Sequence, residues 1–251
     1  MHPLRISICT YNLWNRQRWP AREPALRQFL ARFQPDILCT QELQPETRDC
    51  IDDVLSGHIR VKDDPAGWNR ESNIWWRADL FRRLAHGIED IGHDEPDRGL
   101  FWVRLARPDR NDTLFVATTH LTHPRNEREA ETGQSPRIGQ ARAMIDALDR
   151  VVGDGEAAWV SGDFNDAVHV PAMLHEAGFR ACFSDLAVQP PPTFPALPTA
   201  TVGPGEYFTS ATFDWITAQG PVRVLAASSP QQFTNDLSPS DHWPVLAVYE
   251  L

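Results

Sequence analysis

Short apolar runs, rich in β-branched and aromatic residues and bounded by Pro, Gly, Asp or Asn, recur along the whole chain. Runs of this length and composition are typical of buried β-strands. We predict strands at Ile6–Tyr11, Ile37–Thr40, Asn73–Trp76, Leu100–Leu105, Leu114–Thr119, Ala158–Ser161, Thr212–Thr217, Val222–Ala226 and Trp243–Tyr249.

Between some of these runs the pattern is that of helices, each started or stopped by Pro, Gly or Asp. We predict helices at Glu23–Phe33, Pro45–Leu55, Pro136–Val152 and His169–Ala177. The order of strands and helices is mixed, and no segment repeats at a fixed period. This pattern predicts an α/β (α+β) architecture of sheets packed on each other with helices outside. The length of 251 residues favours a single domain over 1–251.

The segment Gln189–Tyr207 is unusually rich in Pro and Gly. It is too short and too polar to separate two domains, and we interpret it as a long, stiff loop between strands. Two roles stay open for it, an ordinary surface connection or a loop that shapes a binding site.

Polar residues stand where several predicted strands end. Asn12 closes the run ISICTYN, Glu42 closes DILCTQE, and His120 closes LFVATTH. Asp163 and Asn165 close AWVSGDFN, and their spacing of two predicts that they face the same way in extended chain. If these strands lie in one layered core, their ends can converge and bring the polar side chains to one point.

Two more acids and a histidine fall near the C-terminal strands. Asp241 and His242 directly precede the run WPVLAVY, and Asp214 lies inside the apolar run TFDWI. A carboxylate in so apolar a run needs a partner or a metal ion. His242 is the natural partner, because an Asp–His pair fixes the tautomer of the imidazole and raises its basicity.

This set of side chains is rich in oxygen ligands and contains no thiolate, which favours Mg²⁺, or Mn²⁺, over zinc. An ion held by Glu42, with Asn12 and Asp241 adding to its shell, could neutralise a phosphoryl group. His242, oriented by Asp214, could activate water. His120 and Asn165 would stabilise the negative charge that develops in the transition state.

Composition narrows the class of protein. Hydrophobic residues make up 41% and charged residues 23% of the chain, which is ordinary for a globular protein and excludes a disordered or collagen-like one. The formal net charge of −10 argues against a broad positive surface that coats nucleic acid, although a focused site is compatible with it. The scattered cysteines form no CxxC pair, so we predict neither a zinc cluster nor a disulfide framework.

No apolar run approaches the ~20 residues that a membrane span needs. The opening segment MHPLRISICTYNLW also lacks the long apolar stretch and cleavage site of a secretion signal. We therefore expect a cytoplasmic protein without a membrane span. Separately, we expect the protein to be a monomer.

Six short motifs resemble those of the endonuclease/exonuclease/phosphatase superfamily, the deoxyribonuclease I-like metal-dependent phosphoesterases. They follow the order of that family and span almost the whole chain. The motifs are YNLW (Tyr11–Trp14), QE (Gln41–Glu42), THL (Thr119–Leu121), GDFN (Gly162–Asn165), FDWI (Phe213–Ile216) and SDHWP (Ser240–Pro244). The resemblance implies a four-layer αββα sandwich with two mixed β-sheets packed face to face, Mg²⁺ dependence and hydrolysis of phosphate esters.

The resemblance also implies roles for the matching residues. Glu42 is the principal metal ligand, and Asn12 and Asp241 assist it. Asp163 lies beside the attacking water, and Asn165 binds phosphate.

A second group of roles concerns the imidazoles and one arginine. By the same resemblance Asp214 pairs with His242, and either His242 or the carboxylate beside the water takes the proton. Arg98 stands where several relatives carry a phosphate-binding arginine before a strand. Glu71 is a candidate for orienting His120, because carboxylate–imidazole pairs of this kind are common.

A Ser–His–Asp hydrolase triad at Ser240–His242 is rejected, because adjacent residues of an extended segment point in opposite directions and no GxSxG motif occurs. We expect a phosphodiesterase acting on nucleic acid, similar to nucleases or tyrosyl-DNA phosphodiesterases. Trp14, Trp19 and Trp68, in polar loops, are candidates for stacking on a base or sugar. The alternatives are a phosphatase or phosphodiesterase for a small molecule or lipid head group, and a non-catalytic binding protein on the same scaffold.

Overall fold

The computed structural model describes the chain except residues 1–2, 64, 109–111, 125, 198 and 200–209. The strands form two six-stranded sheets. In spatial order the first sheet contains β11 (Arg223–Ser228), β12 (Val245–Glu250), β1 (Arg5–Asn12), β2 (Ile37–Gln41), β4 (Asn73–Arg77) and β3 (His58–Arg60). The second contains β5 (Arg82–Glu89), β6 (Leu100–Ala106), β7 (Thr113–His120), β8 (Ala157–Asp163), β10 (Asp214–Gln219) and β9 (Arg180–Ala181).

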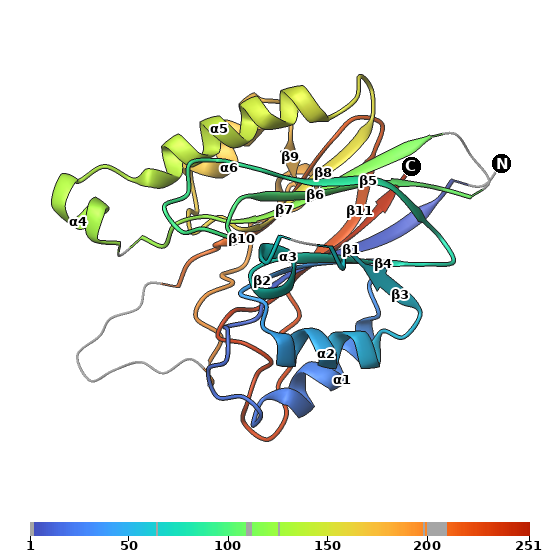
Figure 1. Cartoon of the computed structure of the whole chain (residues 1–251), viewed down its shortest axis with the longest axis vertical. Coiled ribbons are helices and arrows are strands. Elements are labelled where there is room, and N and C mark those ends of the chain that lie inside the picture. The colour runs from blue at the N-terminus through green and yellow to red at the C-terminus, as the bar shows by residue number, and fades with distance from the viewer. Residues whose placement is uncertain (1–2, 64, 109–111, 125, 198, 200–209) are drawn as a thin grey trace.

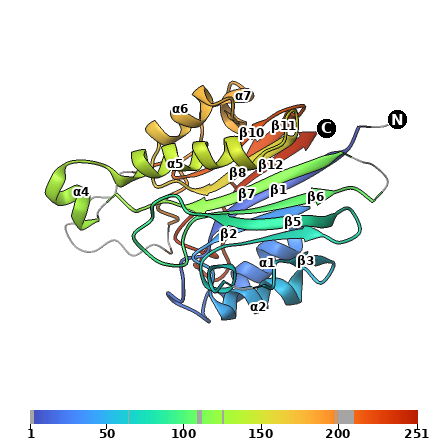
Figure 2. The ribbon, with the colours of Figure 1, turned by 45° about the horizontal axis from the view of Figure 1, so that its top comes forward.

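Helices cover the outer face of each sheet, so the molecule has four layers (Figures 1 and 2). The longer helices are α1 (Glu23–Phe33), α2 (Pro45–Val54), α5 (Pro136–Val151) and α6 (His169–Glu176), and the short ones are α3 (Gly67–Arg70), α4 (Glu127–Thr132) and α7 (Cys182–Asp185). The helices α1 and α2 pack on the first sheet, and α5 and α6 pack on the second. The predicted αββα sandwich of two mixed sheets is confirmed.

Side-chain alternation explains why the strands are apolar on both faces. In β1, Ile6 and Ile8 belong to the core between the sheets, whereas Cys9 and Tyr11 belong to the cluster under α1 and α2. Successive side chains of a strand point to opposite faces, and here each face is covered by another layer. The sequence therefore shows continuous apolar runs rather than a strict alternation of apolar and polar residues.

Each predicted strand and helix is present, with ends displaced by one or two residues. The sequence reading missed β3, β5, β9 and the short helices. The strand β5, with the sequence RRLAHGIE, lies at the edge of its sheet and buries none of its residues fully. A strand without a buried face carries no apolar pattern that would reveal it.

The parallel pair β7 and β8 brings two polar strand ends together, because His120 is paired in register with Asp163. Gly162, next to Asp163, has a φ of +143°, and a Cβ added there would lie 1.9 Å from the backbone oxygen of Thr119. No side chain fits at this distance, so the close approach of the two strands requires glycine.

We predict that Gly162→Ala lowers the free energy of unfolding by about 3 kcal/mol, because the new methyl group must push β7 and β8 apart. Urea denaturation measures the change. Gly57→Ala is the matched control, since a Cβ at Gly57 meets no atom within 4 Å. Equal stabilities of the two variants would contradict this account of the β7–β8 contact.

Candidate active site

The polar strand ends meet between the two sheets. The inward-facing members of four strands share the core cluster between the sheets, namely Ile6 and Ile8 of β1, Leu114 and Val116 of β7, Ala157 and Trp159 of β8, and Ile216 and Ala218 of β10. Alternation by two then places the last or first polar residue of each strand on the same inner face. These residues are Asn12, His120, Asp163 and Asp214, and all of them are buried.

Asn12 connects two carboxylates. Its Nδ2 donates to Oε1 of Glu42 at 3.0 Å and to Oδ2 of Asp163 at 2.9 Å, while its Oδ1 accepts the backbone N–H of Trp14. Glu42 follows β2 in the left-handed region with a φ of +52°, and its Oε2 accepts Nδ2 of Asn15 at 2.7 Å. Each oxygen of the Glu42 carboxylate thus accepts a hydrogen bond from one amide, Oε1 from Asn12 and Oε2 from Asn15.

Asp163 is the most enclosed acid of the cavity, with 1% of its surface exposed. Its Oδ2 lies 3.6 Å from Nε2 of His120 and 3.8 Å from Nε2 of His242, and its Oδ1 accepts the backbone N–H of Asn165. Burial raises the pKa of Asp163, against the opposing charges of the two imidazoles. The two imidazoles and the carboxylate form one electrostatically coupled group.

His120, at the end of β7, is oriented by Glu71. Its Nδ1 lies 3.0 Å from Oε1 of Glu71, which fixes the proton on Nδ1 and turns Nε2 toward Asp163. Burial and the charge of Arg98 lower the pKa of His120, but the hydrogen bond with Glu71 and the charges of Asp163 and Glu71 outweigh them, so the pKa lies above its ordinary value. Arg98 adjoins the same Glu71 oxygen, with Nε at 3.5 Å, and also lines the cavity.

His242 forms the predicted pair with Asp214. Nδ1 of His242 lies 2.8 Å from Oδ2 of Asp214, which is completely buried at the start of β10. Burial lowers the pKa of His242, but the charges of Asp214 and Asp163 raise it well above its usual value. The backbone N–H of Asp214 donates to Oγ1 of Thr193, so the described part of the proline-rich loop packs directly on this pair.

Asp241 lies next to His242 and lines the same cavity as Glu42. Burial raises the pKa of Asp241 to about 7, and the charge of Glu42 adds to this effect, while His242 opposes it. The carboxylates of Glu42 and Asp241 together offer oxygen donors of the kind that a hard divalent cation prefers.

Asn165 also lines the cavity. The expectation that it faces the same way as Asp163 assumed an extended chain at this point. The residue is left-handed with a φ of +49°, so the chain is not extended here. Its Nδ2 donates to the backbone oxygen of Leu121 at 3.0 Å, which ties the end of β8 to the segment after β7.

One cavity of about 560 Å³ gathers most of the predicted residues. Its lining consists of Trp14, Asn15, Gln17, Glu42, Arg98, His120, His123, Pro124, Asp163, Asn165, Phe194, Phe213, Asp241 and His242. Asn12 and Asp214 lie behind this lining, in contact with Asp163 and His242. The structure therefore brings all nine predicted site residues together around one cavity.

Several lining residues were not among the predicted site residues, namely Asn15, Gln17, Phe194 and Phe213. Phe213 does begin the FDWI motif, and Phe194 belongs to the proline-rich loop. Asn15 directly follows a recognised motif, which was the available signal. Of the three tryptophans singled out in loops, Trp14 lines the cavity, whereas Trp68 is a core residue that packs against Phe101.

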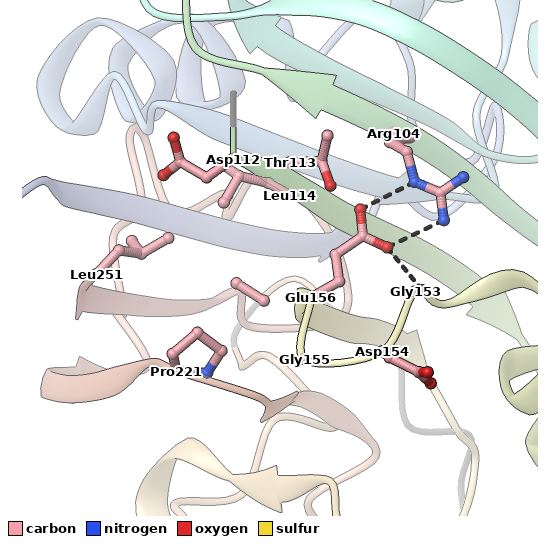
Figure 3. Close-up of a pocket in the computed structure, with 11 residues that line it drawn as sticks. Arg104, Asp112, Thr113, Leu114, Gly153, Asp154, Gly155, Glu156, Pro221 and Leu251 are labelled. Atoms are coloured by element: carbon pink, nitrogen blue, oxygen red, sulfur yellow. Dashed lines mark hydrogen bonds and ion pairs between the residues drawn. The ribbon is translucent and has the colours of Figure 1, made fainter. Parts of the chain in front are cut away.

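A second cavity, of about 600 Å³, lies around the starts of β7 and β8 and next to Leu251 (Figure 3). Its arginine, Arg104, is already paired with Glu156: Nε donates to Oε1 and Nη2 donates to Oε2, each at 2.9 Å. Among the described residues that line this cavity there is neither a histidine nor an amide side chain, so this part of the wall offers no imidazole or amide group for phosphoester chemistry.

No sequence model of a protein family matches the chain, and no curated protein matches it. Solved structures match it over nearly its whole length. TDP2 from D. rerio, complexed with a single-strand DNA product, has a TM-score of 0.80 at 18% identity, covering 98% of this chain and 99% of that one. An endonuclease/exonuclease/phosphatase from Bacteroides vulgatus has a TM-score of 0.77 at 20% identity, covering 99% of each chain.

A mannosyl-6-phosphatase from Bacteroides thetaiotaomicron is also similar, with a TM-score of 0.76 at 19% identity, covering 96% of this chain and 98% of that one. The chain thus has the fold of the endonuclease/exonuclease/phosphatase superfamily, which confirms the resemblance at the level of the fold. Among the described residues, no helix is long and apolar enough to cross a membrane.

We predict that Glu71→Gln lowers the pKa of His120, because it removes a negative charge and a charge-assisted hydrogen bond that both favour the imidazolium form. Titration of the histidine ring resonances by NMR measures the shift. His58 is the internal control, since Glu71 is not among the groups that perturb its pKa. An unchanged titration of His120 would contradict the assigned role of Glu71.

Proposed function

We propose that the protein is a Mg²⁺-dependent phosphoesterase that hydrolyses a phosphodiester by attack of an activated water. The observation that carries the proposal is the buried carboxylate of Asp163, 3.6 Å from Nε2 of His120 and 3.8 Å from Nε2 of His242. Water attack on phosphate needs a proton acceptor and cationic groups that stabilise the growing charge. This cavity offers both within a few ångströms.

The donor set supports a hard divalent cation, with Mg²⁺ as the proposed ion and Mn²⁺ as the alternative. We assign Glu42 and Asp241 as its ligands, because both carboxylates line the cavity and Glu42 contributes to the raised pKa of Asp241. Asn12, expected as an assisting ligand, we assign to orientation, since its Nδ2 holds Glu42 and Asp163 and its Oδ1 accepts the N–H of Trp14.

Asp163, Asp214 and His242 form a compact group whose ligand atoms lie within 4.8 Å of one another. We assign this group to proton transfer and charge stabilisation rather than to metal binding. The 2.8 Å hydrogen bond between Nδ1 of His242 and Oδ2 of Asp214 joins two members of this group. The third member, Asp163, accepts hydrogen bonds at both of its carboxylate oxygens.

When bound, Mg²⁺ would polarise a phosphate oxygen and offset the charge of the phosphoryl group. Asp163 takes the proton of the attacking water as the new P–O bond forms and the ester P–O bond breaks, and the leaving oxygen takes a proton from solvent. The hydrogen bonds from Asn12 and the backbone of Asn165 hold the Asp163 carboxylate in place. The raised pKa of Asp163 makes it a stronger proton acceptor than an ordinary carboxylate. His242 stays protonated near neutral pH because its pKa is also raised, so it stabilises charge instead of accepting the proton.

Three further side chains are proposed to position the phosphate. His120 presents Nε2 to the cavity at 3.6 Å from Oδ2 of Asp163, and Arg98, which lines the same cavity, supplies a positive charge. Asn165 lies in the wall next to the same carboxylate and is proposed to contact a phosphate oxygen. Together with His242 these groups oppose the negative charge that develops during attack.

A phosphodiester in nucleic acid is the proposed substrate. The wall of the cavity includes the rings of Trp14, Phe194 and Phe213, and the two phenylalanine rings stack with centroids 5.9 Å apart. Aromatic faces of this kind bind flat bases by stacking. The structural match to TDP2 with a single-strand DNA product supports the same choice.

A phosphate ester of a small molecule or lipid head group is the second candidate. The net charge of −10 and the match to a mannosyl-6-phosphatase favour it. A non-catalytic binding protein is the third, and the complete set of acid, amide and imidazole groups around the cavity speaks against it.

We predict that purified protein hydrolyses phosphodiesters with Mg²⁺ or Mn²⁺ and loses this activity with a chelator. Glu42→Ala and Asp163→Ala should each lower kcat/KM by at least ~100-fold, because they remove a metal ligand and the proton acceptor. Asp49→Ala is the control, since Asp49 is an exposed acid paired with its neighbour Arg48. Turnover that survives both site substitutions would refute the assignment, and ligand binding without any turnover would identify a binding protein.

The choice of base has its own test, the pH profile of kcat/KM at saturating Mg²⁺. We predict a bell shape that rises as Asp163 loses its proton and falls as His242 loses its own. Asp214→Asn removes a charge that raises the pKa of His242 and also that of Asp163, so the alkaline limb should move to lower pH together with the acid limb. If the acid limb moved while the alkaline limb stayed in place, His242 would be the base.

Salt dependence separates the two substrate classes. If the substrate is nucleic acid, affinity for a single-stranded oligonucleotide should fall by about tenfold or more between ~50 and ~200 mM salt, because phosphate contacts release counterions. Fluorescence anisotropy with catalytically inactive Asp163→Ala protein measures it. An oligonucleotide affinity that does not change with salt concentration, or no binding at low salt, would favour the small-molecule alternative.

A further inference from the structure

Arg22 is a buried cation that has no role in the proposed chemistry. It stands at the N-cap position of α1, where its side chain makes no capping hydrogen bond, and none of its surface is exposed. Among the described residues, no carboxylate lies within ion-pair distance of it. Burial lowers its pKa to about 10, so it stays charged at neutral pH. A buried charge without a paired carboxylate is costly and needs hydrogen bonds to compensate it.

The compensation comes from four backbone carbonyl groups. Nε of Arg22 donates to the oxygen of Gln17 at 2.6 Å, and Nη2 donates to those of Trp14 and Asn15 at 3.2 and 2.7 Å. Nη1 donates to the oxygen of Pro239. The guanidinium group therefore joins the segment after β1 to the segment before β12, which are more than two hundred residues apart in the chain.

Both of these segments carry groups of the candidate metal site. The first carries Asn15, whose Nδ2 donates to Oε2 of Glu42 at 2.7 Å. The second reaches Asp241 two residues after Pro239. The charges of Asp241 and Glu42 also stabilise the Arg22 cation, which places all three groups in one electrostatic neighbourhood.

The first segment also needs support to keep its conformation. Trp14, Asn15 and Arg18 all have left-handed backbones, with φ of +55°, +48° and +54°. Such φ values are unfavourable for residues other than glycine, and they persist where surrounding contacts impose them. The guanidinium group binds the carbonyls of two of these residues and lies over the ring of Trp14, 5.7 Å from its centroid.

We propose that Arg22 is a positioning residue that sets the separation of Glu42 and Asp241, and with it the affinity of the site for a divalent cation. This inference rests on the proposed function, since it assigns the same two carboxylates as ligands. The planar guanidinium fork is essential, because a lysine ammonium has three donors and cannot span four carbonyls in two segments.

The test is calorimetric titration of metal-free protein with MnCl₂, with circular dichroism to establish that each variant is folded. Arg22→Lys keeps the charge and removes the fork, and we expect it to weaken Mn²⁺ binding by about tenfold or more. The matched control is Arg104→Lys, which removes a fork from the Glu156 pair at the second cavity (Figure 3). That variant should bind Mn²⁺ within about twofold of the parent protein.

Each outcome decides a separate point. If Arg22→Lys binds Mn²⁺ like the parent, or if Arg104→Lys loses as much affinity, Arg22 has only a general structural role and the inference is wrong. If Arg22→Lys does not fold, Asn15→Ala decides, because the proposed path to Glu42 runs through this amide: unchanged affinity overturns the inference and weakened affinity supports it. A parent protein that binds no Mn²⁺ overturns the proposed metal site itself.

Discussion

The packing of two sheets against each other is the constraint on which the site depends. Because side chains alternate along a strand, the register that buries Ile6 and Ile8 between the sheets also points Asn12 inward at the end of β1. The same rule applies to His120, Asp163 and Asp214. A shift of one residue in any of these strands would turn a polar end toward the helices, so the core that stabilises the fold also fixes the chemistry.

Burial of charged groups costs free energy, and in this cavity oppositely charged neighbours compensate that cost. Glu71 and Asp214 each stabilise one imidazolium, and the two imidazoles in turn oppose the raised pKa of Asp163. Arg22 is compensated by backbone carbonyls and lies near the remaining acids. The cavity thus contains coupled charges, in which the pKa values of His120, Asp163 and His242 depend on one another.

Much of this arrangement could be predicted from sequence, because the signal lies in strand ends. Asn12, His120 and Asp163 each close an apolar run, and alternation then determines their face. The edge strand β5 could not be predicted, since it has no buried face and therefore no pattern. The tertiary contact from Arg22 to Pro239 was equally invisible, because it depends on left-handed loop residues and on a partner far away in the chain.

The most direct measurement is a crystal structure of the protein with Mn²⁺ and inorganic phosphate, in which the anomalous signal locates the metal. The account predicts one strong peak bonded to carboxylate oxygens of Glu42 and Asp241, with phosphate oxygens between that peak and the imidazoles of His120 and His242. A peak within the group of Asp163, Asp214 and His242, or in the cavity beside Glu156, would contradict it.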